Sequence, residues 1–230
     1  MIRRRPRLAI GRGRTPVWGG ASAPAATLQR VAETSPRVRN PWGQGERLRA
    51  EILRAAARLL SELDGEQGLT IRGVARAAGI SPASIYQHFS DKSALVQGLI
   101  AHIYAQLAAA MAEADAQYPP EAILDRVRAR MKAYCLFALE NPGHYRLIIK
   151  LRPTPSRPTG PLADIVRSII DLLERGEREG IRMRVPPSRA AVIVFVGVHG
   201  RVALQHTSGG EDQDEQIMAF VDELVSLVVD

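Results

Sequence analysis

The sequence predicts an all-α protein, in which three short helices lead into a long helix and then a larger helical region. From about residue 45 onward, apolar residues recur three and four positions apart, as in amphipathic helices, and no segment alternates like a strand. Glycine, proline and serine separate these helical patterns from one another. Aromatic residues make up only 5% of the chain, so Ala, Leu, Val and Ile supply most of the apolar content, and this composition favours helices.

Residues 1 to 44 differ from the rest of the chain in charge and composition. They hold nine arginines and one acidic residue, a charge of +8 in a chain whose net charge is +7, so the remainder carries −1. Their five prolines and five glycines exclude a packed element. We expect a disordered Arg-rich arm or a spurious extension from a mis-set start codon. This segment has no apolar stretch of the kind that a signal peptide requires, and its prolines disfavour an organelle transit peptide.

The first predicted helix begins near Gly45 and ends at Asp64-Gly65. Charged side chains occupy one of its faces. The opposite face carries apolar residues at helical spacing: Leu48, Ile52, Ala55, Ala56, Leu59, Leu60 and Leu63. We therefore expect an amphipathic helix packed on a core.

Two short helices follow, and the residues at their ends mark them clearly. Thr70 suits the N-cap of the first, which ends where Gly79 can adopt the left-handed conformation. Ser81 suits the N-cap of the next, with Pro82 at its first helical position. Six apolar residues are expected to fix the crossing of these helices: Ile71, Val74, Ala75, Ile80, Ile85 and Phe89. Two helices joined by a turn of about three residues form a helix-turn-helix, whose second helix can enter a major groove roughly 12 Å wide.

A fourth helix is expected from Asp91 to about Ala114, long enough to join two domains. Residues 93 to 112 carry no charge, as in a membrane span, but glutamine, glycine and histidine interrupt them and alanine dominates. A buried connecting helix is the preferred interpretation, and no membrane is expected. Five further helices are expected at 121–140, 143–151, 161–179, 187–206 and 212–229.

The run from Leu69 to Leu95, LTIRGVARAAGISPASIYQHFSDKSAL, resembles the DNA-binding domain of the TetR family. Thr70 opens the second helix, an Ala-x-x-Ala-Gly turn follows at residues 75–79, Tyr-x-His-Phe stands at 86–89, and Lys92 starts the fourth helix. The resemblance implies a helix-turn-helix domain over residues 45–92 and a helical ligand-binding and dimerisation domain over 93–230. It also implies a cytoplasmic bacterial transcription regulator.

By the same resemblance, two sets of residues would contact double-stranded operator DNA. Thr70, Tyr86 and Lys92 would hold phosphates, which position a protein, and hydroxyl and ammonium groups suit that task. The residues that would lie along or near base edges are Ser81, Pro82, Ala83, Ser84, Gln87 and His88. Gln87 can make a bidentate contact to adenine, and Arg47 and Arg72 complete the expected contacts.

Some of these positions have a plainer interpretation. Tyr86 and Phe89 could both be core aromatics; we prefer this for Phe89 and the phosphate role for Tyr86. Gly73 departs from the family, which usually has an acidic residue there. Without that acidic residue a capping box cannot form, and glycine itself costs up to about 1 kcal/mol of helix stability. The second helix would then be looser, without loss of DNA binding.

The last two helices are expected to form a homodimer interface. Residues 141–147 and 198–204 resemble the regulatory domain of one TetR subgroup, where the second segment lies beside that interface. Gly197 and Gly200 permit close backbone contact. Apolar stripes run along both helices: Val192, Val196, His199 and Ala203 on one, and Ile217, Phe220, Leu224, Leu227 and Val228 on the other. An intramolecular core explains the stripes equally well, but reading two DNA half-sites requires a dimer.

A mostly apolar cavity for a small-molecule effector is expected between the helices of the C-terminal region. The residues nominated for it are Tyr104, Leu107, Met111, Met131, Tyr134, Cys135, Phe195 and His199. Cys135 is the only cysteine, which excludes an intramolecular disulfide and a cysteine-based zinc site, and we expect it to be buried filler. No cofactor or metal site is expected.

No catalytic set can be assembled, since the five histidines lack metalloprotease spacing and neither a phosphate loop nor a Gly-x-Ser-x-Gly elbow occurs. We therefore expect a repressor that leaves its operator when a small molecule binds, because a tilt of the fourth helix changes the spacing of the two recognition helices. Two alternatives remain: a helical ligand-binding or catalytic protein that keeps the motif as scaffold, and a nonspecific nucleic-acid binder that works through the arm.

Overall fold

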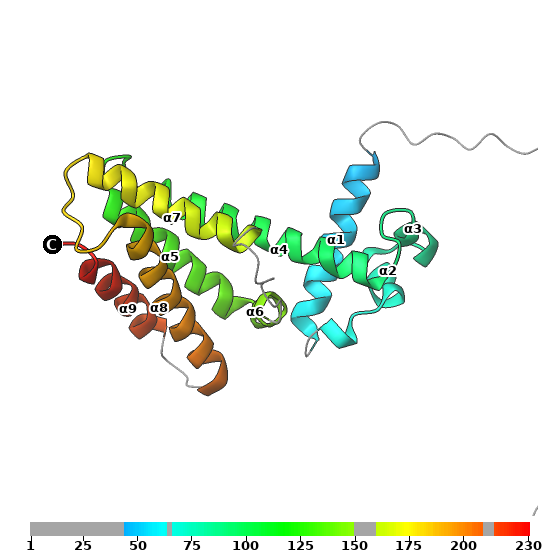
Figure 1. Cartoon of the computed structure of the whole chain (residues 1–230). Helices are drawn as coiled ribbons and strands as arrows, with labels where there is room; N and C mark the ends of the chain where they lie inside the picture. The colour runs from blue at the N-terminus through cyan, green and yellow to red at the C-terminus, as the bar shows by residue number, and fades with distance from the viewer. Residues whose placement is uncertain (1–43, 64–65, 150–159, 209–213) are drawn as a thin grey trace, which may run out of the picture. The chain divides into compact units, whose positions relative to one another are not determined.

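The computed structural model describes residues 44–63, 66–149, 160–208 and 214–230, and these residues are helical almost throughout (Figure 1). The elements, in chain order, are α1 Gln44–Glu62, the 3-10 helix η1 Glu66–Gly68, α2 Ile71–Ala78, α3 Pro82–Tyr86, α4 Lys92–Asp115, α5 Ile123–Glu140, α6 Pro142–Ile149, α7 Pro161–Arg178, α8 Pro187–Ser208 and α9 Asp214–Leu227. Each predicted helix is confirmed with ends shifted by at most a few residues. Within the described ranges, β-structure is limited to one isolated antiparallel bridge between Met183 and Val229. The expected arm of residues 1 to 44, apart from Gln44, lies outside the described residues, as does the Asp64-Gly65 helix end.

The caps that the sequence predicts for the short helices are formed. Thr70 accepts a hydrogen bond from the backbone N–H of Gly73 at 3.0 Å, and Ser81 accepts one from Ser84 at 3.2 Å. Gly79 ends α2 with φ +68°, a left-handed conformation that glycine adopts without strain. Val74, Ala75, Ile85 and Phe89 are buried, whereas Ile71 and Ile80 are half-buried at the edge of the same core.

The long helix α4 contacts α1 and also α5, α6 and α7, as a connecting helix must. Asp91 begins it, because one carboxylate oxygen of Asp91 accepts the backbone N–H of Ala94 at 2.8 Å. Leu99, Ile103 and Leu107 are buried against neighbouring helices. By length and composition, α4 and α8 could each cross a membrane, but the core helices of soluble proteins meet the same criterion, so this is weak evidence.

Helix α5 lies at the centre of the C-terminal helices and contacts α4, α6, α7, α8 and α9. A buried charge cluster joins it to α4: Asp115 is 2% exposed, is bonded to Arg126 at 2.9 Å, and also pairs with Arg130. Two cations around one carboxylate repay the cost of burying that charge, so the cluster fixes how the two helices cross.

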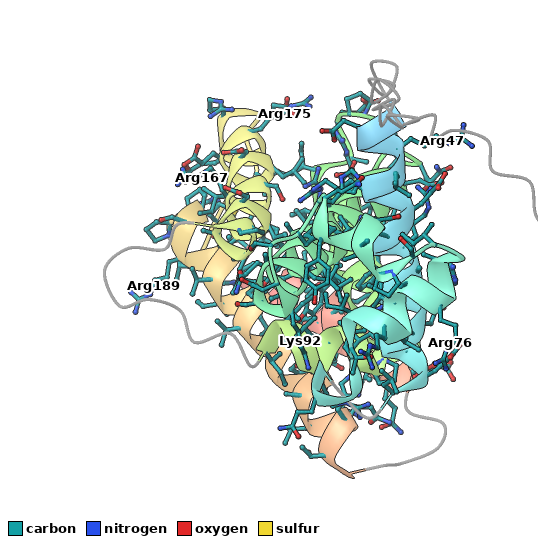
Figure 2. All side chains as sticks on the ribbon, turned by 90° about the vertical axis from the view of Figure 1, so that its right-hand side faces the viewer. Arg47, Arg76, Lys92, Arg167, Arg175 and Arg189 are labelled. Atoms are coloured by element: carbon teal, nitrogen blue, oxygen red, sulfur yellow. The ribbon has the colours of Figure 1, made fainter. Side chains whose placement is uncertain are left out.

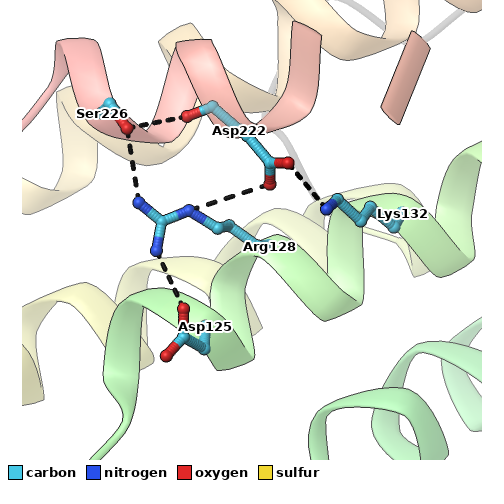
Figure 3. A network of polar contacts seen from close by, with 5 residues as sticks. All are labelled: Asp125, Arg128, Lys132, Asp222 and Ser226. Carbon is cyan, nitrogen blue, oxygen red and sulfur yellow. Dashed lines mark hydrogen bonds and ion pairs between the residues drawn. The ribbon is translucent and has the colours of Figure 1, made fainter. Parts of the chain in front are cut away.

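A more exposed polar network ties α5 to α9 (Figure 3). Asp222 pairs with Lys132 at 2.8 Å and lies 3.8 Å from Arg128. The guanidinium of Arg128 also donates to Asp125 at 2.9 Å and to Ser226 at 3.3 Å. Because these side chains are partly in solvent, we expect the network to orient α9 more than to stabilise it.

The apolar stripe expected on α9 is mostly internal. Ile217, Leu224 and Val228 are buried within the chain, and a Cβ added at Gly197 of α8 would lie 2.7 Å from Leu224. The close approach at Gly197 is therefore an α8–α9 contact inside one subunit. Of the residues in this apolar stripe, only Leu227 is well exposed, at 63%. The intramolecular alternative therefore holds for most of the stripe.

Candidate DNA-reading surface and ligand cavity

Helix α3 presents a short neutral surface to solvent. Pro82, Ala83 and Gln87 are exposed, while Ser84 and His88 are half-buried. The Ser81 and Ser84 hydroxyls bond each other at 2.9 Å, which leaves donor and acceptor capacity for an incoming base edge. His88 lies near the start of α1, since a Cβ added at Gly45 would be 3.9 Å from its Cε1 atom. The residues predicted for base reading therefore lie on α3 or within two residues of its ends.

The candidate phosphate contacts are exposed side chains. Tyr86 is 56% exposed and Phe89 is 4% exposed, so Phe89 is the core aromatic and Tyr86 is not. Thr70 and Lys92 are exposed, and the Lys92 ammonium donates to the Gln67 carbonyl at 3.4 Å. These positions suit groups that hold a backbone without reading its sequence.

Exposed basic side chains extend the same region. Arg72 is exposed on α2, and Arg47 pairs with Glu51 at 3.0 Å on an exposed face of α1. Arg76 is exposed on α2 as well, although the sequence did not single it out; only its outward position on the folded helix distinguishes it. Figure 2 labels six basic side chains: Arg47, Arg76 and Lys92 on α1, α2 and α4, and Arg167, Arg175 and Arg189 on α7 and α8.

The departure at Gly73 has a steric counterpart. A Cβ there would lie 3.0 Å from the Thr70 hydroxyl oxygen and 3.4 Å from Leu59. The Thr70 cap is made without the acidic partner, so the capping box is not needed to start α2.

A cavity of about 180 Å³ opens among five of the C-terminal helices. Its walls come from α4, α5, α6, α7 and α8, and are formed by Tyr104, Leu107, Tyr134, Phe137, Ala138, Tyr145, Ile148, Ile149, Leu162 and His199. Of the residues nominated from the sequence, Tyr104, Leu107, Tyr134 and His199 are brought together here.

The other nominated residues lie elsewhere. Met131 and Cys135 are fully buried in the core and do not line this cavity; burial raises the pKa of the Cys135 thiol to about 12, as expected for inert filler. Phe195 does not line the cavity, but its ring stacks on that of His199, with ring centroids 5.9 Å apart. Met111 lines a neighbouring cavity of about 330 Å³ that includes Arg130 and shares Tyr104 with the first.

Polar groups inside the first cavity form one small network. The Tyr134 hydroxyl and His199 Nδ1 are 2.6 Å apart, and the Tyr145 hydroxyl donates to the His199 carbonyl at 3.5 Å. Burial raises the pKa of Tyr134 far above its usual range, raises that of Tyr145 to about 12, and lowers that of His199. The network is therefore uncharged at neutral pH.

Helix α6 contacts the cavity with one face and α1 with another. Tyr145 and Ile148 line the cavity, whereas His144 Nε2 lies 3.0 Å from the Ala57 carbonyl oxygen of α1. At Gly143 the helices approach so closely that an added Cβ would lie 2.5 Å from the Leu60 carbonyl oxygen. The segment from 141 to 147 stood out in the sequence, but its position between cavity and α1 depends on contacts between residues more than 80 positions apart.

Among the residues that the structure describes, no group of three or more His, Cys, Asp or Glu side chains could hold a metal ion.

The comparisons with known proteins match both parts of the chain. Residues 52–99 match the tetR family of bacterial regulatory proteins, and residues 127–228 match the tetracyclin repressor-like C-terminal domain. The nucleoid occlusion factor SlmA of Vibrio cholerae is 34% identical over 101 residues, which are 44% of this chain and 50% of that protein. The chain thus spans about half the length of the curated relatives it matches.

Solved structures share the fold over a larger part of the chain. A protein of unknown function from Rhodococcus sp. RHA1 has a TM-score of 0.66 and 26% identity, covering 84% of this chain and all of that one. A TetR family transcription regulator from Marinobacter aquaeolei VT8 has a TM-score of 0.61 and 18% identity, covering 81% of this chain and 98% of its own. At that identity the second likeness shows the fold alone.

Proposed function

Because the chain belongs to the TetR family of DNA-binding transcription regulators, we propose that it is a repressor that leaves its operator when a small molecule binds. Residues 45–92 would form the DNA-binding domain, and residues 93–230 the ligand-binding and dimerisation domain. The observation that carries the proposal has two parts. Helix α3 is capped and exposed, and the aromatic cavity is lined by helix α6, which also contacts α1.

The residues around α3 divide by chemistry into two roles. Thr70, Tyr86 and Lys92 would hold phosphates, and Gln87 would read a base edge from the exposed end of α3. The chain after residue 44 carries a net charge of −1, so operator affinity would depend on the fit of α3 as much as on charge.

A second copy of the chain would cover the outer face of α8. Val196 and Leu204 are 59% and 63% exposed, and a Cβ added at Gly200 would meet no atom within 4 Å. Leu227 of α9 is exposed as well. Exposed apolar side chains of this kind favour an interface, because a second subunit would remove them from water. A Val196→Arg substitution should give a monomer in sedimentation equilibrium and weaken operator binding, whereas Ala112→Glu, on an exposed face of α4, should change neither.

The response would pass through α6 and α4 together. Both helices line the cavity and both contact α1, so a ligand that displaces Tyr145 or Tyr104 would move α1 and the recognition helices. A change in the spacing of two recognition helices from the 34–36 Å of successive major grooves would release the operator.

Footprinting of the purified protein on DNA upstream of its own gene tests this function. We expect a protected palindrome at about 50 mM salt, where phosphate contacts are strongest, and release by an effector. Absence of specific protection would overturn the regulator and favour a helical binding protein or enzyme that keeps the motif as scaffold. Deletion of residues 1–40 should weaken the complex and lower its salt sensitivity; complete loss of binding would instead favour a nonspecific binder that works through the arm.

We place this regulator in the bacterial cytoplasm, where its operator would lie. Nucleoid occlusion, the role named for the Vibrio cholerae relative, is not carried over, because that match takes in about half of each chain.

A further inference from the structure

Among the residues that the structure describes, the wall of the 180 Å³ cavity carries no charged side chain, and half of its residues carry an aromatic ring. Tyr134, Tyr145 and Phe137 bring ring faces and edges from α5 and α6, and His199 faces them from α8. Arg130 lies in the neighbouring cavity, where it is already paired with Asp115. Because an isolated charge is costly to bury, these described walls favour an uncharged ligand over a charged one.

The size of the cavity limits the ligand further. An apolar cavity of roughly 150 Å³ in another protein accepts benzene, so about 180 Å³ holds one aromatic ring with a small substituent. Tyr134 and Phe195 meet edge-to-face with ring centroids 5.5 Å apart, and Tyr145 adds a second tyrosine ring to the cavity wall. A flat ring suits such walls better than a flexible chain, because aromatic pairs prefer these offset and edge-on geometries.

The Tyr134–His199 bond determines what His199 offers to the ligand. A phenol hydroxyl is the better donor of the pair, so Tyr134 donates to Nδ1 and the proton of the neutral imidazole resides on Nε2. Among the described residues, neither Nε2 of His199 nor the Tyr104 hydroxyl has a hydrogen-bond partner. Both are donors on the cavity wall.

We propose that the effector of this cavity is an uncharged, single-ring aromatic molecule with one oxygen that accepts a hydrogen bond from His199 Nε2, such as an aryl ketone or ester. This inference rests on the proposed function, because it assigns a ligand class to the cavity that the regulator would use. The rings supply most of the contact area, and the His199 donor fixes the orientation.

Three probes of nearly equal shape separate the elements of this proposal by isothermal titration calorimetry on the full chain without DNA. Acetophenone has the ring and the acceptor, α-methylstyrene replaces the oxygen by a methylene group, and benzoate adds a charge. We expect acetophenone to bind about 3- to 10-fold more tightly than α-methylstyrene, as for one hydrogen bond, and benzoate to give no measurable heat. Equal binding of the first two, binding of benzoate at least as tight as acetophenone, or no binding of any probe would overturn the proposal.

A variant assigns the preference to its donor. His199→Phe keeps a ring in place and removes Nε2, so the preference for acetophenone should vanish while α-methylstyrene binding is retained. His206→Phe is the matched control, since His206 lies outside the cavity wall and its Nε2 bonds the Ala138 carbonyl at 3.1 Å. His199→Phe leaves the Tyr134 hydroxyl without its partner. If circular dichroism shows that this variant does not fold, the double variant Tyr134→Phe, His199→Phe, which lacks that hydroxyl, takes its place. A preference that survives in a folded His199 variant would overturn the assignment.

Failure of this inference and failure of the proposed function give different results. If the protein footprints its promoter and binds none of the probes, the ligand class is wrong and the regulator stands. If acetophenone binds with the expected preference and no specific DNA is protected, the ligand class stands and the regulator is wrong.

Discussion

Helices α1 to α3 and the helices around the cavity use their polar side chains in opposite ways. In the first region Thr70, Ser81 and Asp91 cap helix ends, and the polar side chains face solvent. In the second, Tyr134 and His199 are turned toward each other inside the fold. A surface built by local caps can be recognised from a short stretch of sequence, whereas a cavity built by distant helices cannot. The predictions below test this division.

The largest effect is expected on the outward face of α3. Ala83→Glu places a negative charge where DNA phosphates and base edges would lie, without touching the core. Operator affinity in a mobility-shift assay should fall by about 1–3 kcal/mol, roughly 5- to 150-fold, with unchanged thermal unfolding. Ala112→Glu on α4 is the charge-matched control and should bind normally. Equal loss in both variants would show that net charge, rather than α3, governs binding.

The next effect tests the contact between α6 and α1. Gly143→Ala would force a Cβ against the Leu60 carbonyl, so we expect the free energy of unfolding in urea to fall by about 1–3 kcal/mol. Effector-induced release of DNA should weaken as well. Gly45→Ala is the control, because the nearest atom to its added Cβ is 3.9 Å away. Wild-type stability in the Gly143 variant would mean that α6 does not dock tightly on α1.

Acidification should weaken the cavity region. Burial lowers the pKa of His199, and also those of His102 and His206, below the ordinary value of 6.5. Below pH 6.5 the unfolded chain therefore binds more protons than the folded chain. The free energy of unfolding is highest above about pH 6.5 and falls as the pH drops below it. Tyr134 and Tyr145, which face His199 from α5 and α6, stay neutral throughout this range.

Urea unfolding at intervals from pH 7.5 to 5.5 measures this dependence. His199→Phe should flatten the slope in part and leave the contributions of His102 and His206. A slope as steep as that of the wild type would show that His199 is protonated in the folded protein.

The smallest effect is expected for the network in Figure 3. Lys132 and Asp222 are 35% and 44% exposed, so Lys132→Ala should cost about 0.2–1 kcal/mol and less at high salt. Arg47→Ala, which removes a more exposed pair on α1, should cost no more than this. A loss above about 2 kcal/mol at Lys132 would mean that the pair is effectively buried.

The sequence was sufficient wherever structure is set by near neighbours. Thr70, Gly79 and Ser81 marked the ends of α2 and α3 because capping involves residues three or four positions apart. The burial of Phe89 followed from its place four residues after the buried Ile85, whereas the outward role of Tyr86 was expected only from the family resemblance.

The cavity was predicted only in part for the opposite reason. Met131 and Tyr134 lie on the same helix and looked alike, but only Tyr134 faces the opening, because α6 and α8 pack against that side of α5. The wall contributed by Tyr145 and Ile148 was missed. The stripe on α9 showed apolar periodicity without indicating whether its partner is α5, α8 or another subunit.

The two sets of contacts along α6 have a consequence for the ligand-responsive regulator proposed above. Substitutions at Ile148 or Ile149 alter the shape of the cavity, while Gly143 and His144 hold the helix on α1. In the proposed regulator, substitutions could therefore change which ligand binds without changing how α6 contacts α1. Biosensor engineering on this scaffold would keep residues 143–144 fixed and randomise the cavity positions beyond them.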